Sequence, residues 1–423
     1  MPAGMTAAEK IFAAHSGRDR VAAGDIVVAR VDRILLHDIT GALAFSQFAA
    51  MGAERVAAPD QVVLVGDHYS PPPSPDAAEL LKLMDGFAAE RGIRHVFTTG
   101  QGIEHTLLPE QGLLRPGDLV IGTDSHTCTA GAFAALGTGM GSSDVAAAMA
   151  LGELWFMVPH TIRVVFSGAR RRFVTGKDFI LAVLGAISVD GATYQCLEFD
   201  GEAVGGLSMD ERMALCNMAV EAGAKTAFVP PDEATHAWAM AKHGEHGALV
   251  RSDADAVFSR SVAIDAAAIE PLCAHPFAPD NVHPVRETGG VAINQAYIGN
   301  CANGTMADLR QAAEILAGRR VARGVRCIIV PATRAIYLKA LREGLIDIFA
   351  EAGAIVGPST CGACAGLHMG ALAEGQVAVA TTNRNYRGRM GAHSSRVYLA
   401  NAWVAAASAV AGEIVHPAAV MGA

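Results

Sequence analysis

Short apolar runs alternate with amphipathic segments along most of the chain. Four of the runs are almost entirely apolar and are typical of buried strands in a parallel sheet: residues 62–65, 119–121, 326–330 and 377–380. The segments between such runs carry apolar positions at helical spacing. Strands that alternate with helices in this way predict an α/β architecture.

Two amphipathic segments carry clear signals for the start of a helix. Ser74 precedes Pro75, an apolar stripe follows over residues 80–89, and Gly92 comes next, so we predict a helix capped by Ser74 and ended by Gly92. Ser142, Ser143 and Asp144 predict a second start of the same kind, for a helix that runs through Leu151.

Unusual polar residues stand just beyond the ends of the predicted strands. They are Asp67-His68, Asp124-Ser125-His126, Cys301 and Asn383-Arg384-Asn385. In open α/β sheets, ligands bind outside the carboxyl ends of the strands. Four such ends with ionisable or ligating groups therefore predict one cleft that is assembled from several domains.

The chain is long enough for more than one domain. Its 423 residues are 51% hydrophobic, which predicts two or three domains with large cores. The mean hydropathy of +0.29 owes much to Ala and Val, and no apolar run approaches the length of a membrane span. Composition changes only gently along the chain, and we place domains at residues 1–165, 166–280 and 281–423.

Charge and cysteine usage limit the partners and the compartment. The formal net charge is −9, with acids and bases interspersed, which argues against nonspecific nucleic-acid binding. The first ten residues lack the pattern of a signal peptide, and the cysteines show no disulfide pattern. We therefore expect a cytoplasmic protein with neither a membrane nor a nucleic acid as partner.

Three of the eight cysteines are candidate metal ligands. Cys361-Gly-Ala-Cys364 follows Cys301 by sixty positions. Three thiolates can hold an iron–sulfur cluster by three corners, and a missing fourth ligand leaves one Lewis-acidic iron open to substrate. By itself, Cys-x-x-Cys also fits a zinc half-site, a redox pair or two packed thiols. We expect ordinary buried residues at the other five: Cys128, Cys196, Cys216, Cys273 and Cys327.

A group of histidines and carboxylates suits proton transfer to a leaving hydroxyl. Its members are Asp67, His68, His105, Asp124, His126 and Glu221. A carboxylate beside a histidine keeps the imidazolium populated near neutral pH, so the histidine can act as an acid. The alternative is that each histidine is a structural residue with its hydrogen bonds satisfied.

An arginine-rich loop spans residues 383–391. Because the guanidinium group binds carboxylates bidentately, Arg384 and Arg389 could clamp a di- or tricarboxylate. The alternative is a solvated basic loop whose ion pairs contribute little.

Together these segments resemble the aconitase superfamily, in its family of 3-isopropylmalate dehydratase and homoaconitase large subunits. The resemblance rests on residues 6–11 with His15, 37–40, 102–105, 109–112, 122–129, 217–221, the loops of Cys301 and of Cys361 and Cys364, and 383–391. It implies three α/β/α domains of the aconitase iron–sulfur type around a central cluster cleft, without the C-terminal swivelling domain.

The resemblance also implies a role for each residue of the candidate site. Cys301, Cys361 and Cys364 would ligate one [4Fe-4S] cluster per subunit, with one iron not ligated by the protein. The carboxylate–histidine pairs would be Asp67–His68, Asp124–His105 and Glu221–His126. Asn217, Asn303 and Asn383 would lie beside the cluster, and His37, Ser125, Arg384 and Arg389 would contact the substrate.

The swivelling domain of this family carries the catalytic serine and a further substrate-binding arginine. This chain ends soon after His416, so we expect both residues to come from a separate small subunit. The activity implied is that of a hydro-lyase acting on a 2-hydroxy di- or tricarboxylate, first of all the conversion of 2-isopropylmalate to 3-isopropylmalate.

Four positions depart from the usual pattern of the family, namely Asn300, Ala302, Thr305 and Ala363. They leave open a homoaconitase, or a dehydratase of another substituted malate such as dimethylmalate or methylcitrate. A protein of another class, an iron-sensing RNA-binding relative of aconitase, is a further alternative that the acidic charge and the missing fourth domain disfavour.

Overall fold

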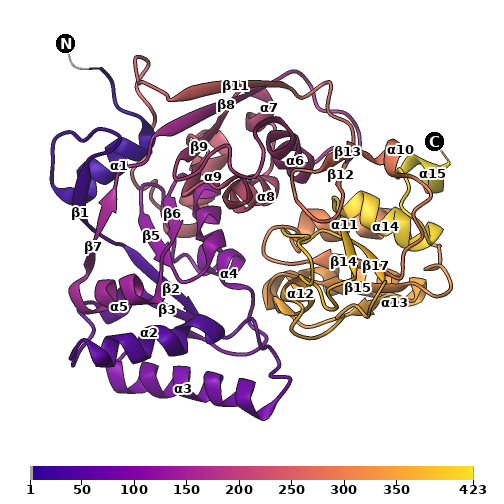
Figure 1. Cartoon of the computed structure of the whole chain (residues 1–423), viewed down its shortest axis with the longest axis horizontal. Coiled ribbons are helices and arrows are strands. Elements are labelled where there is room, and N and C mark those ends of the chain that lie inside the picture. The colour runs from indigo at the N-terminus through magenta and orange to yellow at the C-terminus, as the bar shows by residue number, and fades with distance from the viewer. Residues whose placement is uncertain (1–2, 423) are drawn as a thin grey trace.

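The computed structural model describes residues 3–422. Its first large sheet has five parallel strands in the order β4-β3-β2-β5-β6 (Figure 1). The strands are β2 (Arg33–His37), β3 (Val62–Val65), β4 (His95–Phe97), β5 (Leu119–Gly122) and β6 (Leu136–Gly139). The helices around it are α2 (Asp38–Ala50), η1 (Pro59–Gln61), α3 (Pro75–Arg91), α4 (Glu104–Glu110), η2 (Ser125–Phe133) and α5 (Ser142–Leu151).

Alternate side chains of this sheet enter two different cores, as the period of two along a strand requires. Val62 and Leu64 of β3 pack in the core that holds Phe45, Phe48 and Phe87 of α2 and α3, while Val63 and Val65 belong to the core shared with α4 and the second sheet. The apolar runs are continuous because both faces of this parallel sheet are covered.

A short antiparallel ribbon, β1 (Ile26–Arg30) with β7 (Glu153–Met157), lies near α1 (Ala7–Ser16) at one edge of the molecule (Figure 1). The second large sheet is parallel and has the order β10-β9-β8-β11. Its strands are β8 (Thr161–Ser167), β9 (Cys196–Asp200), β10 (Thr226–Phe228) and β11 (Arg260–Asp265). Its helices are α6 (Gly176–Ile187), α7 (Glu202–Gly205), α8 (Met209–Asn217), η3 (Met218–Ala222) and α9 (Glu233–His243).

The third sheet has the order β13-β12-β18-β17-β14-β15-β16, with β12 antiparallel to both of its neighbours. Its strands are β12 (Leu272–Ala274), β13 (Val282–Pro284), β14 (Gln295–Gly299), β15 (Arg326–Val330), β16 (Ile355–Val356), β17 (Val377–Ala380) and β18 (Arg396–Leu399). Its helices are α10 (Val285–Thr288), α11 (Met306–Leu316), α12 (Arg334–Arg342), α13 (Leu345–Ala352), η4 (Gly362–Ala365), α14 (Ala402–Ala411) and α15 (Ala418–Met421).

The α/β prediction is confirmed, and all four predicted strands are present, as β3, β5, β15 and β17. Helix α3 has the predicted Ser74 and Gly92 caps. The predicted start of α5 was wrong in one respect: the N-cap is Gly141 and no side chain caps the helix, because Ser142 already lies within the first turn.

The predicted domain limits stay a prediction. Residue 165 lies inside β8, and residue 280 lies between β12 and β13 of the third sheet. The outermost limits, residues 1 and 423, lie outside the described residues.

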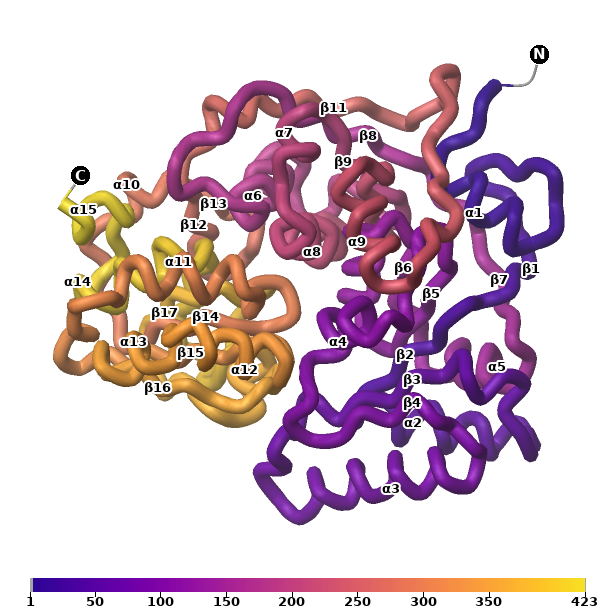
Figure 2. The backbone as a smooth tube through the Cα atoms, turned by 180° about the vertical axis from the view of Figure 1, so that it is seen from behind, coloured from indigo at the N-terminus to yellow at the C-terminus, as the bar shows by residue number. Residues whose placement is uncertain are grey.

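The sheet of β2–β6 and the sheet of β12–β18 occupy opposite sides of the molecule, with the helices of the second sheet beside both of them (Figures 1 and 2). Segments that adjoin these two sheets also contact each other directly. Ile103 N–H donates to the Ala332 carbonyl over 2.8 Å, and Cys361 N–H donates to the Asp67 carbonyl over 3.0 Å. Within residues 3–422, no helix is long and apolar enough to cross a membrane.

Candidate active site

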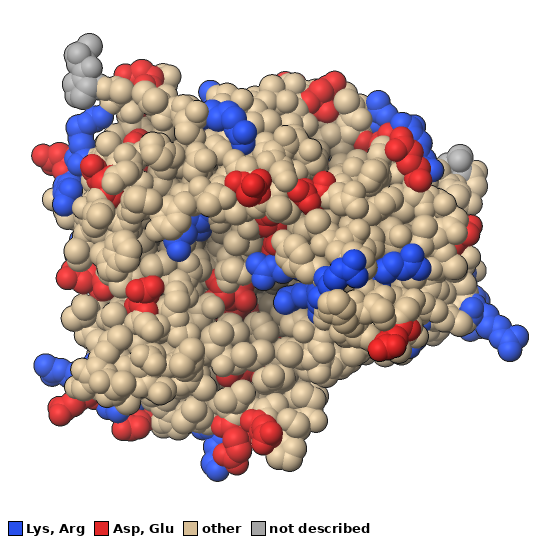
Figure 3. All heavy atoms as spheres, in the orientation of Figure 1, with Lys and Arg blue, Asp and Glu red and all other residues tan. Residues whose placement is uncertain are grey.

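The polar residues beyond the strand ends come together where the first and third sheets face each other. Asp67 and His68 follow β3, Asp124 follows β5, Cys301 follows β14 and Asn383 follows β17. Direct contacts join these segments: Thr106 Oγ1 of α4 donates to the Cys301 carbonyl over 3.1 Å. Figure 3 shows this region as a hollow near the centre of the face, with acidic and basic side chains on its walls.

Cys301, Cys361 and Cys364 are all buried at this meeting point. The side-chain amides of Asn217 and Asn383 donate to Cys301 Sγ over 3.2 and 3.3 Å. A hydrogen bond from the Cys361 thiol, together with the charge of Arg389, outweighs burial and holds the pKa of Cys364 well below its usual range. Burial raises the pKa of Cys301, and the hydrogen bond to Cys364, followed by burial, raises the pKa of Cys361. Cys364 is therefore the one of these three cysteines whose thiolate the protein itself favours.

These residues fit an iron–sulfur cluster better than a single metal ion. Three soft thiolates are the donor set that such clusters use. Among residues 3–422, groups whose ligand atoms all lie within 4.8 Å of one another consist of histidines and carboxylates, and the three cysteines do not form one. The three sulfurs are thus not all within 4.8 Å of one another, although Cys361 and Cys364 are hydrogen-bonded to each other. The other five cysteines are buried and free, as predicted.

Asp67 and His68 form the first histidine–carboxylate pair, with 2.6 Å between Oδ1 and Nδ1. Asp67 is fully buried, and its other oxygen accepts the Glu104 backbone N–H over 2.9 Å. Burial alone would lower the pKa of His68, but the charge and hydrogen bond of Asp67 raise it to about 9. His68 therefore carries a proton at neutral pH.

Asp124 joins the second and third pairs. Its Oδ1 lies 3.0 Å from His105 Nε2 and 3.1 Å from His126 Nδ1, and His126 Nε2 lies 3.0 Å from Glu221 Oε1. Asp124 also caps η2, since its side chain accepts the His126 N–H. Burial would raise the pKa of Asp124, but the hydrogen bonds from His105 and His126 hold it well below its usual range.

Arg384 extends this chain of polar contacts toward the hollow. Its Nε donates to Glu221 Oε1 over 2.7 Å, and its Nη2 donates to Ser125 Oγ over 2.9 Å. The Nε of Arg389 is buried without a protein partner in the part of the chain that the structure describes. The loop is thus tied to the site and is not the solvated basic loop of the alternative reading.

His37 lies against the first pair. Its ring stacks on His68 with 4.0 Å between centroids, its Nδ1 accepts the Ile39 N–H, and its Nε2 lies 2.9 Å from Thr40 Oγ1. Burial, followed by the charge of His68, lowers the pKa of His37 to about 3, so its ring is neutral.

Asn303 forms hydrogen bonds with nearby residues of its own loop and of α11. Its amide nitrogen donates to Asp308 over 3.1 Å, and its backbone N–H donates to Asn300 Oδ1 over 2.8 Å. Asn300 in turn donates to Asn383 Oδ1 over 2.6 Å, so both asparagines support the loop that carries Cys301.

Three further ionisable residues of the site were not predicted from the sequence. Asp38 accepts the backbone N–H groups of His68 and Tyr69, Glu104 lies buried beside His105, and the Lys177 ammonium donates to the carbonyls of Thr381 and Thr382. Glu104 stood next to a predicted histidine, which is a usable signal. Lys177 gave none, because a lysine in the first turn of a helix is usually exposed.

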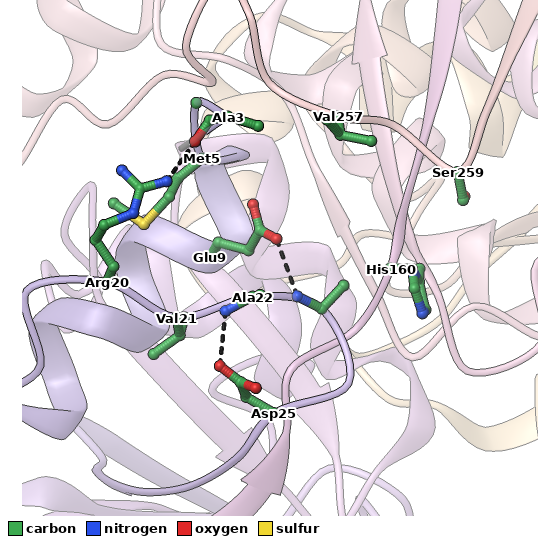
Figure 4. A pocket seen from close by; sticks show the side chains of 12 residues that line it. Ala3, Met5, Glu9, Arg20, Val21, Ala22, Asp25, His160, Val257 and Ser259 are labelled. Atoms are coloured by element: carbon green, nitrogen blue, oxygen red, sulfur yellow. Dashed lines mark hydrogen bonds between the residues drawn. The ribbon is translucent and has the colours of Figure 1, made fainter. Parts of the chain in front are cut away.

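Another pocket lies between α1 and the start of β11, and none of its lining residues belongs to the candidate active site (Figure 4). Its charged groups are already bonded: Glu9 accepts the Ala23 N–H, Asp25 accepts the Ala22 N–H, and Arg20 donates to the Ala3 carbonyl. The pocket therefore has no part in the candidate active site.

Sequence comparison places the chain among well-described relatives. The model of the aconitase family (aconitate hydratase) matches residues 9–290 and 286–412. The 3-isopropylmalate dehydratase large subunit of Nitratidesulfovibrio vulgaris is 52% identical over 97% of this chain and 99% of its own. The 3-isopropylmalate dehydratase large subunit 1 of Methanopyrus kandleri is 49% identical over 98% of this chain and 99% of its own length. The 3-isopropylmalate dehydratase large subunit of Aquifex aeolicus is 47% identical over 98% of this chain and 97% of its own length.

A solved structure supports the fold independently. The crystal structure of Thermococcus kodakaraensis aconitase X in its holo-form superimposes with a TM-score of 0.51, covering 89% of this chain and 88% of that one. At 14% identity, this likeness concerns the fold alone.

Proposed function

The chain belongs to the aconitase family, and from this premise we propose that it is the large subunit of 3-isopropylmalate dehydratase, a hydro-lyase. The observation that carries the proposal is the meeting of three buried cysteines with three histidine–carboxylate pairs at the carboxyl ends of strands. The relatives that bear this name match the chain over almost its whole length.

Cys301, Cys361 and Cys364 would hold a [4Fe-4S] cluster in which one iron has no protein ligand. When bound, the cluster would supply a Lewis acid for the hydroxyl and one carboxylate of the substrate. The amides of Asn217 and Asn383 support this assignment, because N–H donors directed at a sulfur stabilise its negative charge.

His68 is the best candidate for the acid that protonates the leaving hydroxyl. Asp67 keeps it charged at neutral pH and fixes its ring through Nδ1, which leaves Nε2 to face a substrate. His105 and His126 share Asp124. Both ring nitrogens of His126 are bonded to carboxylates, so His126 would hold Asp124 and Glu221 in place rather than contact the substrate.

Arg384 and Ser125 would bind a carboxylate of the substrate. Glu221 accepts from Nε of Arg384 and Ser125 Oγ accepts one hydrogen of Nη2, so Nη1 and the second hydrogen of Nη2 remain to bind an anion. Arg389 would bind in the same way, since its own Nε has no protein partner among the described residues.

A separate small subunit would complete the site. The base that removes the C–H proton must lie within hydrogen-bond reach of that proton. Each family-matched residue of this chain already has a role at the cysteines, at the hydroxyl or at a carboxylate. A serine and a further arginine of the small subunit would supply the missing functions.

The test is to purify the chain with its small subunit under anaerobic conditions and to follow the conversion of 2-isopropylmalate to 3-isopropylmalate. We expect the highest kcat/KM for isopropylmalate in a panel that includes homocitrate, dimethylmalate and methylcitrate. A higher kcat/KM for another acid of the panel would move the assignment to that substrate. No turnover of any of them would contradict the proposed function.

One of the four departures from the family pattern has a structural role. Thr305 is the N-cap of α11, and its side chain shares a capping box with Asp308. A residue used to start a helix in this way is not free to bind substrate.

A further inference from the structure

Glu104 carries a buried carboxyl group that the three histidine–carboxylate pairs leave unused. Its side chain is 1% exposed, and neither of its carboxyl oxygens has a hydrogen-bond partner among residues 3–422. Buried polar groups normally have a partner, because leaving one without any costs free energy. The placement of this acid therefore calls for a functional explanation.

Glu104 touches two of the pairs at once. Its backbone N–H donates to Asp67 Oδ2 over 2.9 Å, and its Oε1 lies 3.6 Å from His105 Nε2. The chain holds it there firmly, since the adjoining Ile103 N–H is bonded to Ala332 and a Cβ at Gly102 would lie 2.8 Å from Thr333 Cγ2.

The surroundings of the Glu104 carboxyl are rich in other acids. The titratable groups that face it are His37, Asp38, Asp67, His105 and Asp124, and His68 is bonded to Asp67. Burial, followed by the charges of Asp67, Asp124 and Asp38, raises the pKa of Glu104 well above its usual range. Burial, the absence of a hydrogen-bond donor among the described residues and the neighbouring carboxylates thus all favour the protonated acid.

A bound metal cation would be another way to compensate a charge at this place, but His37 disfavours it. Ligand atoms of His37, Glu104 and Asp124 lie within 4.8 Å of one another. However, His37 Nδ1 accepts the Ile39 N–H and its Nε2 is bonded to Thr40 Oγ1, so neither nitrogen is left for a metal. A retained proton is the simpler solution.

We propose that Glu104 is a positioning residue that stays uncharged in the working enzyme, and that its ionisation at alkaline pH weakens binding of the dicarboxylate substrate. The inference rests on the proposed function, because it takes a dianion as the substrate. Ionisation would release the proton to solvent and add a negative charge next to Asp67 and Asp124. That charge would repel the dianion that Arg384 and Arg389 attract.

The first test compares the wild-type two-subunit holoenzyme with Glu104→Gln and Glu104→Leu, measuring KM and kcat for isopropylmalate against pH. In the wild type, KM should rise by about tenfold per pH unit once the group ionises, since only the protonated form binds well. Both variants should keep KM flat over that range. All three proteins should lose kcat together as His68 loses its proton near pH 9.

Glu110 provides a matched control on the same helix. It is also partly buried, but its carboxyl group is bonded to Thr333 Oγ1 and lies outside the pairs. Glu110→Gln should therefore retain the wild-type rise in KM. Superimposable KM profiles of the wild type, Glu104→Gln and Glu104→Leu would overturn the proposal.

A second test requires no turnover. Because folded Glu104 holds a proton that the unfolded chain releases, rising pH should destabilise the wild type relative to Glu104→Gln. The gap in Tm should widen as pH rises above about 4.3, the pKa of an unperturbed glutamate. A constant gap, or failure of both uncharged variants to fold, would contradict an uncharged Glu104. Absence of wild-type turnover with a widening gap would instead count against the proposed function alone.

Discussion

Single residues decide whether the cysteine site can be assembled. Cys301, Cys361 and Cys364 meet in one buried region, whereas Cys128 and Cys327 lie in apolar cores. We expect Cys301→Ser, Cys361→Ser and Cys364→Ser each to abolish the visible thiolate-to-iron absorption of anaerobically reconstituted protein, because each removes one ligand.

The matched controls are Cys128→Ser and Cys327→Ser, which should keep that absorption. Mild oxidation of the wild type should release the open iron and leave a paramagnetic three-iron form. Full absorption in Cys364→Ser would show that this residue is not a ligand.

The raised pKa of His68 predicts how kcat depends on pH. Asp67 raises its pKa to about 9, so the imidazolium is populated below pH 9 and lost as pH rises through that value. If His68 is the acid, kcat should fall on the alkaline side near pH 9, and His68→Ala should lose at least about a hundredfold in turnover.

Cluster absorption in His68→Ala should stay near that of the wild type, since His68 is not a ligand in the proposed set. A near-normal rate in this variant would mean that His68 is a structural residue.

At the scale of elements, η2 holds the Asp124 segment against the second sheet. A Cβ at Gly131 of this helix would lie 2.0 Å from the Ala227 carbonyl oxygen of β10, so the backbones pack with no space for a side chain. We expect Gly131→Ala to lower the free energy of unfolding by about 1–3 kcal/mol, the usual cost of overpacking.

Gly86 offers a control within α3, because a Cβ there would meet nothing within 4 Å. Gly86→Ala should stabilise the protein by up to about 1 kcal/mol, since alanine favours the helix. Chemical denaturation of both variants checks the pair, and an unchanged midpoint in Gly131→Ala would show that η2 can move away from β10.

The elements that could be predicted are those whose signals are local. The apolar runs of β3, β5, β15 and β17 and the caps of α3 depend on neighbouring residues, and the polar residues after each strand were visible in the same way. The side-chain cap of α5 was predicted wrongly because Gly141 starts the helix one residue earlier.

At the scale of the whole molecule, the roles of Glu104 and Lys177 could not be predicted because distant segments create them. Glu104 is buried where α4 meets Ala332, and Lys177 is buried by the end of β17, more than two hundred positions away. The pairs Asp124–His105 and Glu221–His126 were expected only from family resemblance, since no spacing within the chain reveals them.

At the same scale, we expect the activity of the chain to depend on a partner subunit. In the proposed roles, His68 is the acid, Arg384 and Arg389 bind carboxylates and the three cysteines hold the cluster, which leaves no residue of this chain to remove the C–H proton. We therefore expect the isolated chain to assemble its cluster and yet to be almost inactive.

Titration with the small subunit should raise turnover by orders of magnitude and saturate as the complex forms. Cluster absorption, measured before and after mixing, separates a missing partner from a missing cluster. Robust hydro-lyase activity of the isolated chain, at full cluster content, would show that the base lies within these 423 residues.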